Sequence, residues 1–227
     1  MVIKEIDDFD SFEFEQSIDI YKSSFPSNET RPVQRVVVML KNDKNYHLFI
    51  SVNNNSVVGI ALMYIFKPLR IGLLDYISVI PNYRRRGIGE ELFKFTLEKF
   101  GSLVSNGIGL LIEIQRENVL DPEESVVRKD RISFYTLLGA KVLEGVNYLL
   151  PPMRNGGEAE EMYLMIRPLG EVHHLSKASV VRYIRAIYST IYQYHSNNLL
   201  DRISQKLPAK IMLYAMTDQS SSRDKIC

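Results

Sequence analysis

The sequence predicts an α/β fold: a mostly antiparallel mixed sheet flanked by helices, with one parallel pair of strands at its centre. Two observations lead to this prediction. Residues 47–80 hold three β-rich runs, the first two joined by asparagines, which is the pattern of an antiparallel meander. Residues 73–114 show a strand, a glycine turn, an amphipathic helix and a second strand, and such a crossover places its two strands in parallel.

The N-terminal elements come first. Residues 2–6 alternate enough to form a strand, and residues 12–25 carry apolar side chains at helical spacing and end before a proline. Residues 24–32 have no clear period and are expected to form a loop. The runs at 47–52 and 57–64 then make the hairpin, because asparagine tolerates left-handed dihedrals.

The strand at 73–80 ends at Pro81, because proline cannot donate to a sheet ladder. A helical stripe follows at 88–100, with Gly101 as the expected stop, and a buried strand at 109–114.

Beyond this unit, residues 117–129 are polar and predict a loop or a poorly formed turn, followed by a helix at 130–138. Residues 141–143 and 161–167 are expected to be closing strands. The loop between them, 147–160, contains paired prolines and glycines and is a candidate lid or specificity loop.

The turn before the helix at 88–100 is built to hold an anion. The first N–H groups of a helix are unpaired, and the positive end of its dipole favours negative charge. Gly87 and Gly89 allow close backbone approach, and three arginines at 84–86 add charge that suits phosphate oxygens. The stretch therefore predicts a phosphate or pyrophosphate site, although the lysine of a P-loop is absent.

The same stretch resembles motif A of the GNAT acetyltransferase superfamily, and the chain is similar to a bacterial-type member. The matching residues, at the family's spacing, are Val79, Pro81, Tyr83, Arg84, Gly87 and Gly89. The resemblance implies acetyl-CoA as cosubstrate, a bulge near the end of the strand at 73–80, and a freed amide near Val79 for the thioester carbonyl. The cofactor-binding residues that it implies are Ile77, Val79, Arg84, Arg85, Arg86, Gly87, Ile88, Gly89 and Glu90.

Residues 131–143 resemble the family's motif B at Phe134, Tyr135 and Gly139-Ala140, and depart from it upstream, at Arg128 and Arg131. Many GNAT enzymes carry at the second aromatic position the tyrosine that faces the CoA sulfur. A phenol is protonated at neutral pH, so Tyr135 is the candidate acid that protonates the leaving thiolate. The alternative is an aromatic side chain that packs on the sheet.

The general base is expected among carboxylates within apolar strands, where burial raises a carboxyl pKa toward neutrality. Glu113 and Asp75 fit this description, and a water relay without a dedicated base is the alternative. Transfer is expected to be direct, in a ternary complex, because the single cysteine is Cys227 and none lies in the core to carry the acyl group. The acceptor, a small-molecule amine or a protein amine, stays open.

The family domain is expected to span residues 1–168, followed by a helical extension at 169–215 and a disordered tail at 216–227. Ser176 is the expected N-cap of the first helix of the extension, whose tyrosine-rich stripe is interpreted as packing, and a second short helix is expected at 198–207.

Composition narrows the function classes. The net charge of +1 argues against nucleic acid, and a lone cysteine and unpaired histidines argue against a metal site. Without a signal region or a long apolar run, we expect a cytoplasmic protein with no membrane contact, as a monomer or homodimer. The rival interpretation is a non-catalytic acyl-CoA-binding regulatory module.

Overall fold

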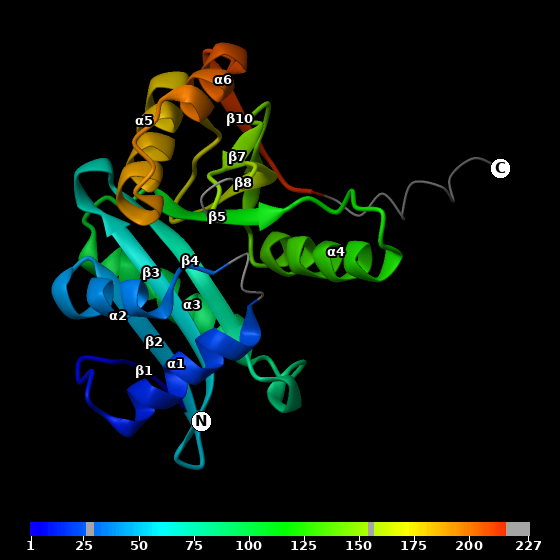
Figure 1. The fold of residues 1–227 in the computed structure, drawn as a ribbon. Coiled ribbons are helices and arrows are strands. Elements are labelled where there is room, and N and C mark those ends of the chain that lie inside the picture. Colours follow the sequence, from blue (N-terminus) through cyan, green and yellow to red (C-terminus); the bar gives the residue numbers. More distant parts are fainter. Residues whose placement is uncertain (26–29, 154–156, 217–227) are drawn as a thin grey trace. The chain divides into compact units, whose positions relative to one another are not determined.

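The computed structural model describes residues 1–25, 30–153 and 157–216, and the chain divides into two compact units (Figure 1). The first holds residues 1–111 and 152–158, and the second holds residues 112–151 and those from 159 onward. Strand β5 (Gly109–Gln115) begins in the first unit and ends in the second. The expected disorder of 216–227 concerns residues that, from 217 on, lie outside the described part.

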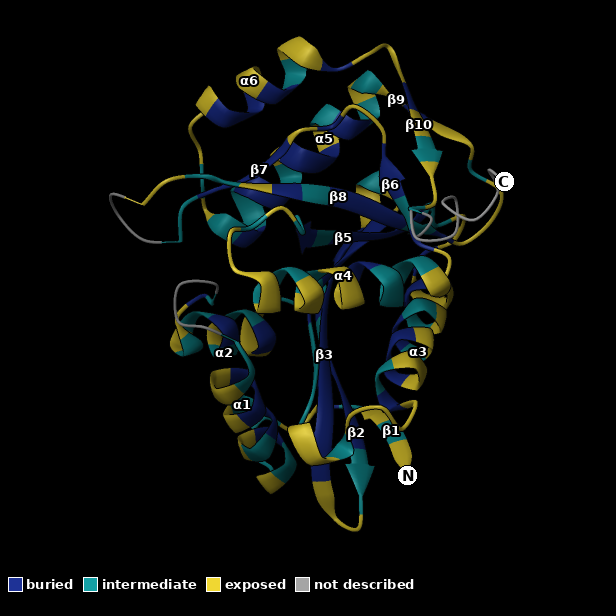
Figure 2. Cartoon of the chain, turned by 90° about the vertical axis from the view of Figure 1, so that its right-hand side faces the viewer, coloured by how far each residue is buried: buried dark blue, intermediate teal, exposed yellow. Residues whose placement is uncertain are grey.

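The first unit is built on an antiparallel run of strands in the order β1-β2-β3-β4, with β5 parallel to β4, as predicted. Nearly all of β3 is buried, and Figure 2 shows α1 and α2 on one face of this sheet and α3 on the other. The elements are β1 (Val2–Glu5), α1 (Phe12–Ser24), α2 (Val33–Asn42), β2 (Tyr46–Asn53), β3 (Ser56–Phe66), η1 (Lys67–Leu69), β4 (Ile71–Val79), η2 (Pro81–Tyr83) and α3 (Ile88–Leu103).

The second unit carries strands in the order β5-β8-β6-β10-β9, with β7 paired to β8. Helices α5 and α6 pack apolar faces inward, and Val180, Ile184 and Ile187 of α5 are fully buried. The elements are α4 (Pro122–Leu137), β6 (Lys141–Leu143), β7 (Tyr148–Leu150), β8 (Glu160–Pro168), β9 (His174–Ser176), α5 (Lys177–Ile187), the π-helical turn η3 (Tyr188–Tyr192), α6 (Asn198–Lys206) and β10 (Lys210–Tyr214).

Two helix boundaries differ from the predictions. Helix α3 continues through Gly101 to Leu103, so that glycine is not the stop. Helix α4 begins at Pro122, within the stretch predicted to be a loop, because the Asp121 side chain accepts hydrogen bonds from the amides of Glu123 and Glu124.

Strand β4 has a bulge in its pairing with β3. Leu62 pairs with Tyr76 and Met63 pairs with Leu74, so Asp75 is the extra residue. Val79 pairs in regular register with Gly59. The bulge puts an acidic side chain at the irregular point of the strand.

Candidate active site

The glycine turn lies in the first unit, between the end of β4 and α3. Arg84 links the turn to the end of β4, because its Nε donates to the Val79 carbonyl oxygen at 2.9 Å. Arg85 and Gly87 then take positive φ angles of 59° and 80°, and α3 begins at Ile88. The Glu91 amide donates to the Gly87 carbonyl at 3.0 Å, which is the first hydrogen bond of the helix. The amides that precede Glu91 in the first turn therefore have no acceptor within the helix.

The surroundings of the turn suit an anion. Arg84, Arg85 and Arg86 are exposed, and the Arg86 guanidinium lies over the Tyr83 ring at 5.2 Å. A Cβ atom at Gly87 would meet nothing within 4 Å, so the positive φ, rather than crowding, favours glycine there. The turn thus offers backbone donors and cationic side chains to a phosphate group.

The end of β4 is more open than its beginning. Residues 71–74 are buried, whereas Ile77, Ser78 and Val79 are half-buried. Ile77 pairs with Ala61 of β3. The expected thioester-side positions, Ile77 and Val79, therefore lie on a strand end that leads directly into the arginine turn.

Asp75 is placed in a buried ion pair. Its Oδ2 accepts hydrogen bonds from Arg31 Nη2 and from the Tyr46 hydroxyl, and the side chains of Arg31 and Asp75 are only 1% and 3% exposed. Burial is the largest single influence and lowers the pKa of Arg31. The charge of Asp75, its hydrogen bond and the phenols of Tyr46 and Tyr76 together outweigh burial and hold that pKa well above its usual range. The carboxylate is thus bound to a permanent cation.

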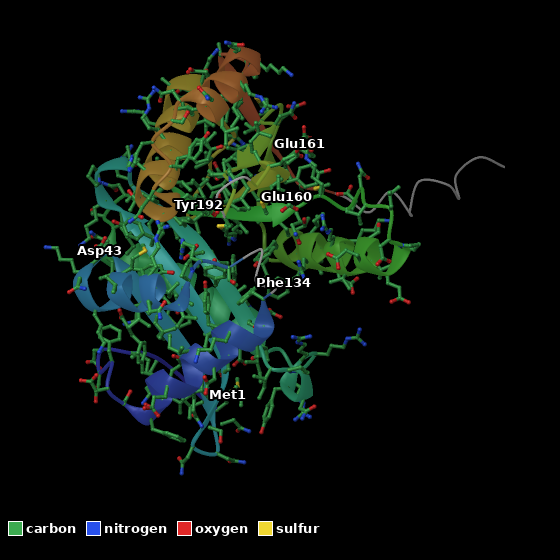
Figure 3. All side chains as sticks on the ribbon, in the orientation of Figure 1. Met1, Asp43, Phe134, Glu160, Glu161 and Tyr192 are labelled. Carbon is green, nitrogen blue, oxygen red and sulfur yellow. The ribbon has the colours of Figure 1, made fainter. Side chains whose placement is uncertain are left out.

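Tyr135 lies on α4, in the second unit, and is half-buried. Its ring meets that of Phe134 edge-on, with the centroids 5.1 Å apart (Phe134 is labelled in Figure 3). Burial raises the pKa of the Tyr135 phenol above its ordinary value, and the charge of Arg131 opposes the rise. The phenol is therefore firmly protonated at neutral pH.

The arginines that depart from motif B have partners in the same unit. Arg131 donates to the side-chain oxygen of Gln115 at 2.9 Å, and Arg128 pairs with Glu124 at 2.8 Å. Arg128 also donates to the Arg116 carbonyl at 3.1 Å. They hold α4 to the end of β5.

Glu113, on β5, is also in the second unit and is half-buried. Its Oε1 accepts a hydrogen bond from the Tyr148 hydroxyl, and its Oε2 accepts one from the Tyr192 hydroxyl at 2.5 Å. Burial, followed by the charge of Glu113, raises the pKa of Tyr148 well above its usual range. No sequence motif points to either phenol; the signal for Tyr192 is the tyrosine-rich stripe before residue 193, whose helical spacing indicates packing.

Within residues 1–25, 30–153 and 157–216, none of the helices has the length and apolar character needed to cross a membrane. In the same ranges, His, Cys, Asp and Glu side chains form no group of three or more that could hold a metal ion.

Solved structures with the same fold include acetyltransferases. A putative GNAT acetyltransferase from Bacteroides thetaiotaomicron is 20% identical, with a TM-score of 0.65, and the match covers 85% of this chain and 98% of that one. An aminoglycoside 6'-N-acetyltransferase complexed with coenzyme A is 18% identical, with a TM-score of 0.57 and coverage of 76% and 99%.

The ribosomal-protein-S18-alanine N-acetyltransferase of Escherichia coli is also 18% identical, with a TM-score of 0.54 and coverage of 75% and 95%. No curated protein matches the chain. Residues 14–118 match the model of the acetyltransferase (GNAT) family. This matched range contains the whole of the strand–turn–helix stretch. Residues 14–118 of the chain are therefore similar to the acetyltransferase (GNAT) family, and the solved structures above share its fold.

Proposed function

We propose that the chain transfers an acetyl group from acetyl-CoA directly to a primary amine. The observation that carries the proposal is the turn at 84–90, where exposed arginines and the open amides of α3 surround a glycine with φ of 80°. In this proposal the amides of Arg85 to Glu90 bind the pyrophosphate, and the backbone of Ile77 and Val79 lies along the thioester arm.

Acetyl-CoA supplies an activated thioester. The chain must remove a proton from the acceptor amine and give one to the leaving thiolate. An amine with a pKa of about 10.4 is mostly protonated at pH 7, and presenting it neutral costs about 4.6 kcal/mol. We assign Glu113 as the base that takes this proton. Asp75 is the second candidate, and its pairing with Arg31 favours Glu113 over it.

Tyr135 is the proposed acid that returns a proton to the leaving sulfur. A phenol of ordinary pKa already carries its proton at neutral pH, as a donor must, so the assignment rests on the motif B position; burial, which raises the pKa of Tyr135, makes this phenol a weaker acid. The proposed transfer is direct, since Cys227 is the only cysteine in the chain.

The acceptor is proposed only as a class. Among proteins of the same fold, the names of two point to an aminoglycoside and to a ribosomal protein as acceptors, so both a small-molecule amine and a protein amine belong in a screen.

Calorimetric titration with acetyl-CoA and with CoA tests the cofactor assignment. We expect micromolar binding by the wild-type chain and at least a tenfold loss in the double variant Gly87→Glu, Gly89→Glu, because two carboxylates would repel the pyrophosphate. Gly170→Glu is the matched control, since Gly170 is exposed and a Cβ atom there meets nothing within 4 Å. Absence of binding to either ligand by the wild type would refute the proposal.

Thiol release from acetyl-CoA in the presence of an amine panel tests turnover. Tyr135→Phe should lower kcat by about 100-fold or more while leaving CoA binding intact, because only the proton donor is lost. Tight binding without turnover on any amine would support the non-catalytic alternative instead.

A further inference from the structure

The Glu113 carboxylate is held by phenols from two distant parts of the chain. Tyr148, on β7, donates to Oε1 and is fully buried, whereas Tyr192, at the end of η3, donates to Oε2 and is half-buried. Tyr192 lies beyond residues 14–118, the part that matches the family model. Figure 3 labels Tyr192 at the end of the helix formed by α5 and η3.

The position of Tyr192 is set by buried neighbours. In η3 the helix widens into a π-helical turn, a feature that re-aims side chains and recurs at functional sites. Tyr188, at the start of this turn, is 2% exposed and donates to the Leu149 carbonyl, next to Tyr148. Ile191 is fully buried. Tyr188 therefore anchors the turn to β7, and Ile191, directly before Tyr192, anchors it in the core.

Hydrogen bonds to both oxygens have two physical effects. They favour the ionised form of the carboxyl group, and they restrict its rotamers, which removes part of the entropy cost of orienting a base. The phenols of Tyr148 and Tyr192 face Glu113, and the phenol of Tyr188 lies beside them. The phenols of Tyr148 and Tyr192 donate to the carboxylate, whereas that of Tyr188 donates to the Leu149 carbonyl.

We propose that Tyr192 is a positioning residue that holds Glu113 ionised and oriented, so that the C-terminal segment completes the proton-accepting site. The inference rests on the proposed function, in which Glu113 is the base. In that step an N–H bond of the acceptor ammonium breaks, an O–H bond forms on Glu113, and the phenolic proton of Tyr192 stays in place.

Titration of the Glu113 carboxyl carbon by NMR, in protein labelled with ¹³C-glutamate, tests the contact without any acceptor. Tyr192→Phe keeps the ring and removes the donor, so the Glu113 resonance should titrate about one pH unit higher. Tyr194→Phe is the matched control: Tyr194 packs on Tyr188 at 5.8 Å, and its variant should titrate as the wild type. An unchanged Glu113 titration in Tyr192→Phe would overturn the inference.

Acetyl transfer to benzylamine then tests the catalytic consequence. In Tyr192→Phe the acidic limb of kcat should move up by about one pH unit, with about a tenfold loss below the limb and near wild-type rates above it. A purely structural role would instead lower the plateau and leave the limb in place, which would contradict the proposal.

Glu113→Gln separates this inference from the function on which it rests. It should abolish the limb and lower kcat by about 100-fold, and adding Tyr192→Phe to it should cause no further loss. Wild-type activity in Glu113→Gln would refute the base assignment itself. A lost limb in Glu113→Gln, with a wild-type limb in Tyr192→Phe, would refute only the role of Tyr192.

Discussion

The ion pair of Arg31 and Asp75 shows how one side chain ties several elements together. The Tyr21 hydroxyl donates to the Arg31 carbonyl at 3.0 Å, and the Arg31 guanidinium lies over the Tyr46 and Tyr76 rings at 5.8 and 5.3 Å. The guanidinium Nε and Nη1 are buried and have no acceptor among the described residues. Such a site depends on its carboxylate, because a buried charge that loses its partner is strongly unfavourable.

Replacing Arg31 by Met should therefore destabilise the first unit by about 3–5 kcal/mol, since it leaves the Asp75 carboxylate buried without its cation. Urea unfolding measures the change. The double variant Arg31→Met, Asp75→Asn should recover part of the loss, and Lys22→Met, which removes an exposed ion pair with Asp19, is the control, expected to stay within about 0.5 kcal/mol. A loss below about 1 kcal/mol for Arg31→Met would mean that the pair does not hold the fold.

At the scale of elements, helix α4 depends on its N-terminal cap. Asp121 has extended backbone angles and accepts from two amides of the first turn, and Pro122 occupies the first helical position. Asp121→Ala should lower the free energy of unfolding by about 1 kcal/mol, as measured by urea titration. Asp130→Ala, an exposed change in the middle of the same helix, should cost nothing or stabilise slightly. Equal effects of the two variants would contradict the capping role.

Local sequence patterns predict the elements in which the apolar period extends over many residues. They fail for elements whose structure depends on contacts with distant parts of the chain. The strand, turn and helix at 71–103 agree with the prediction to within about three residues, because apolar periodicity and glycines mark them. Strands β7, β9 and β10 have only three to five residues each and owe their structure to pairing partners far along the chain. Helix α2 is rich in valine, a β-former, and was not predicted.

The residues of the candidate site also fall into those that a local motif predicts and those that only distant contacts bring together. The arginine turn is a contiguous motif, so its residues could be named from the sequence. Tyr192 lies 79 residues after Glu113 and Tyr148 lies 35 residues after it, and no local spacing links them to that carboxylate. Asp75 was identified as a strand carboxylate, but its partner Arg31 lies in a segment without a period.

At the scale of the whole chain, the C-terminal segment belongs to the sheet of the second unit. Leu213 pairs with Leu143 and Tyr214 pairs with Val142, so β10 lies beside β6 as its antiparallel neighbour. Ser176, the predicted N-cap, accepts from the Ser179 amide and starts α5, whose inner face is buried. The division of the chain at residue 168 remains a prediction, and truncation tests it.

A chain that ends at Pro168 should lose the folded second unit. It would leave β6 without β10 and would expose the apolar surface that Ile184, Ile187 and Ile191 cover. Each buried isoleucine contributes about 1.5–3 kcal/mol, so several of them amount to a large part of the roughly 5–15 kcal/mol that stabilises a domain. We expect aggregation or rapid proteolysis of the 1–168 chain, monitored by limited trypsin digestion, whereas a chain of residues 1–216 should resist as the full chain does. A 1–168 chain that melts cooperatively at the same temperature as the full chain would show that the extension is dispensable for folding.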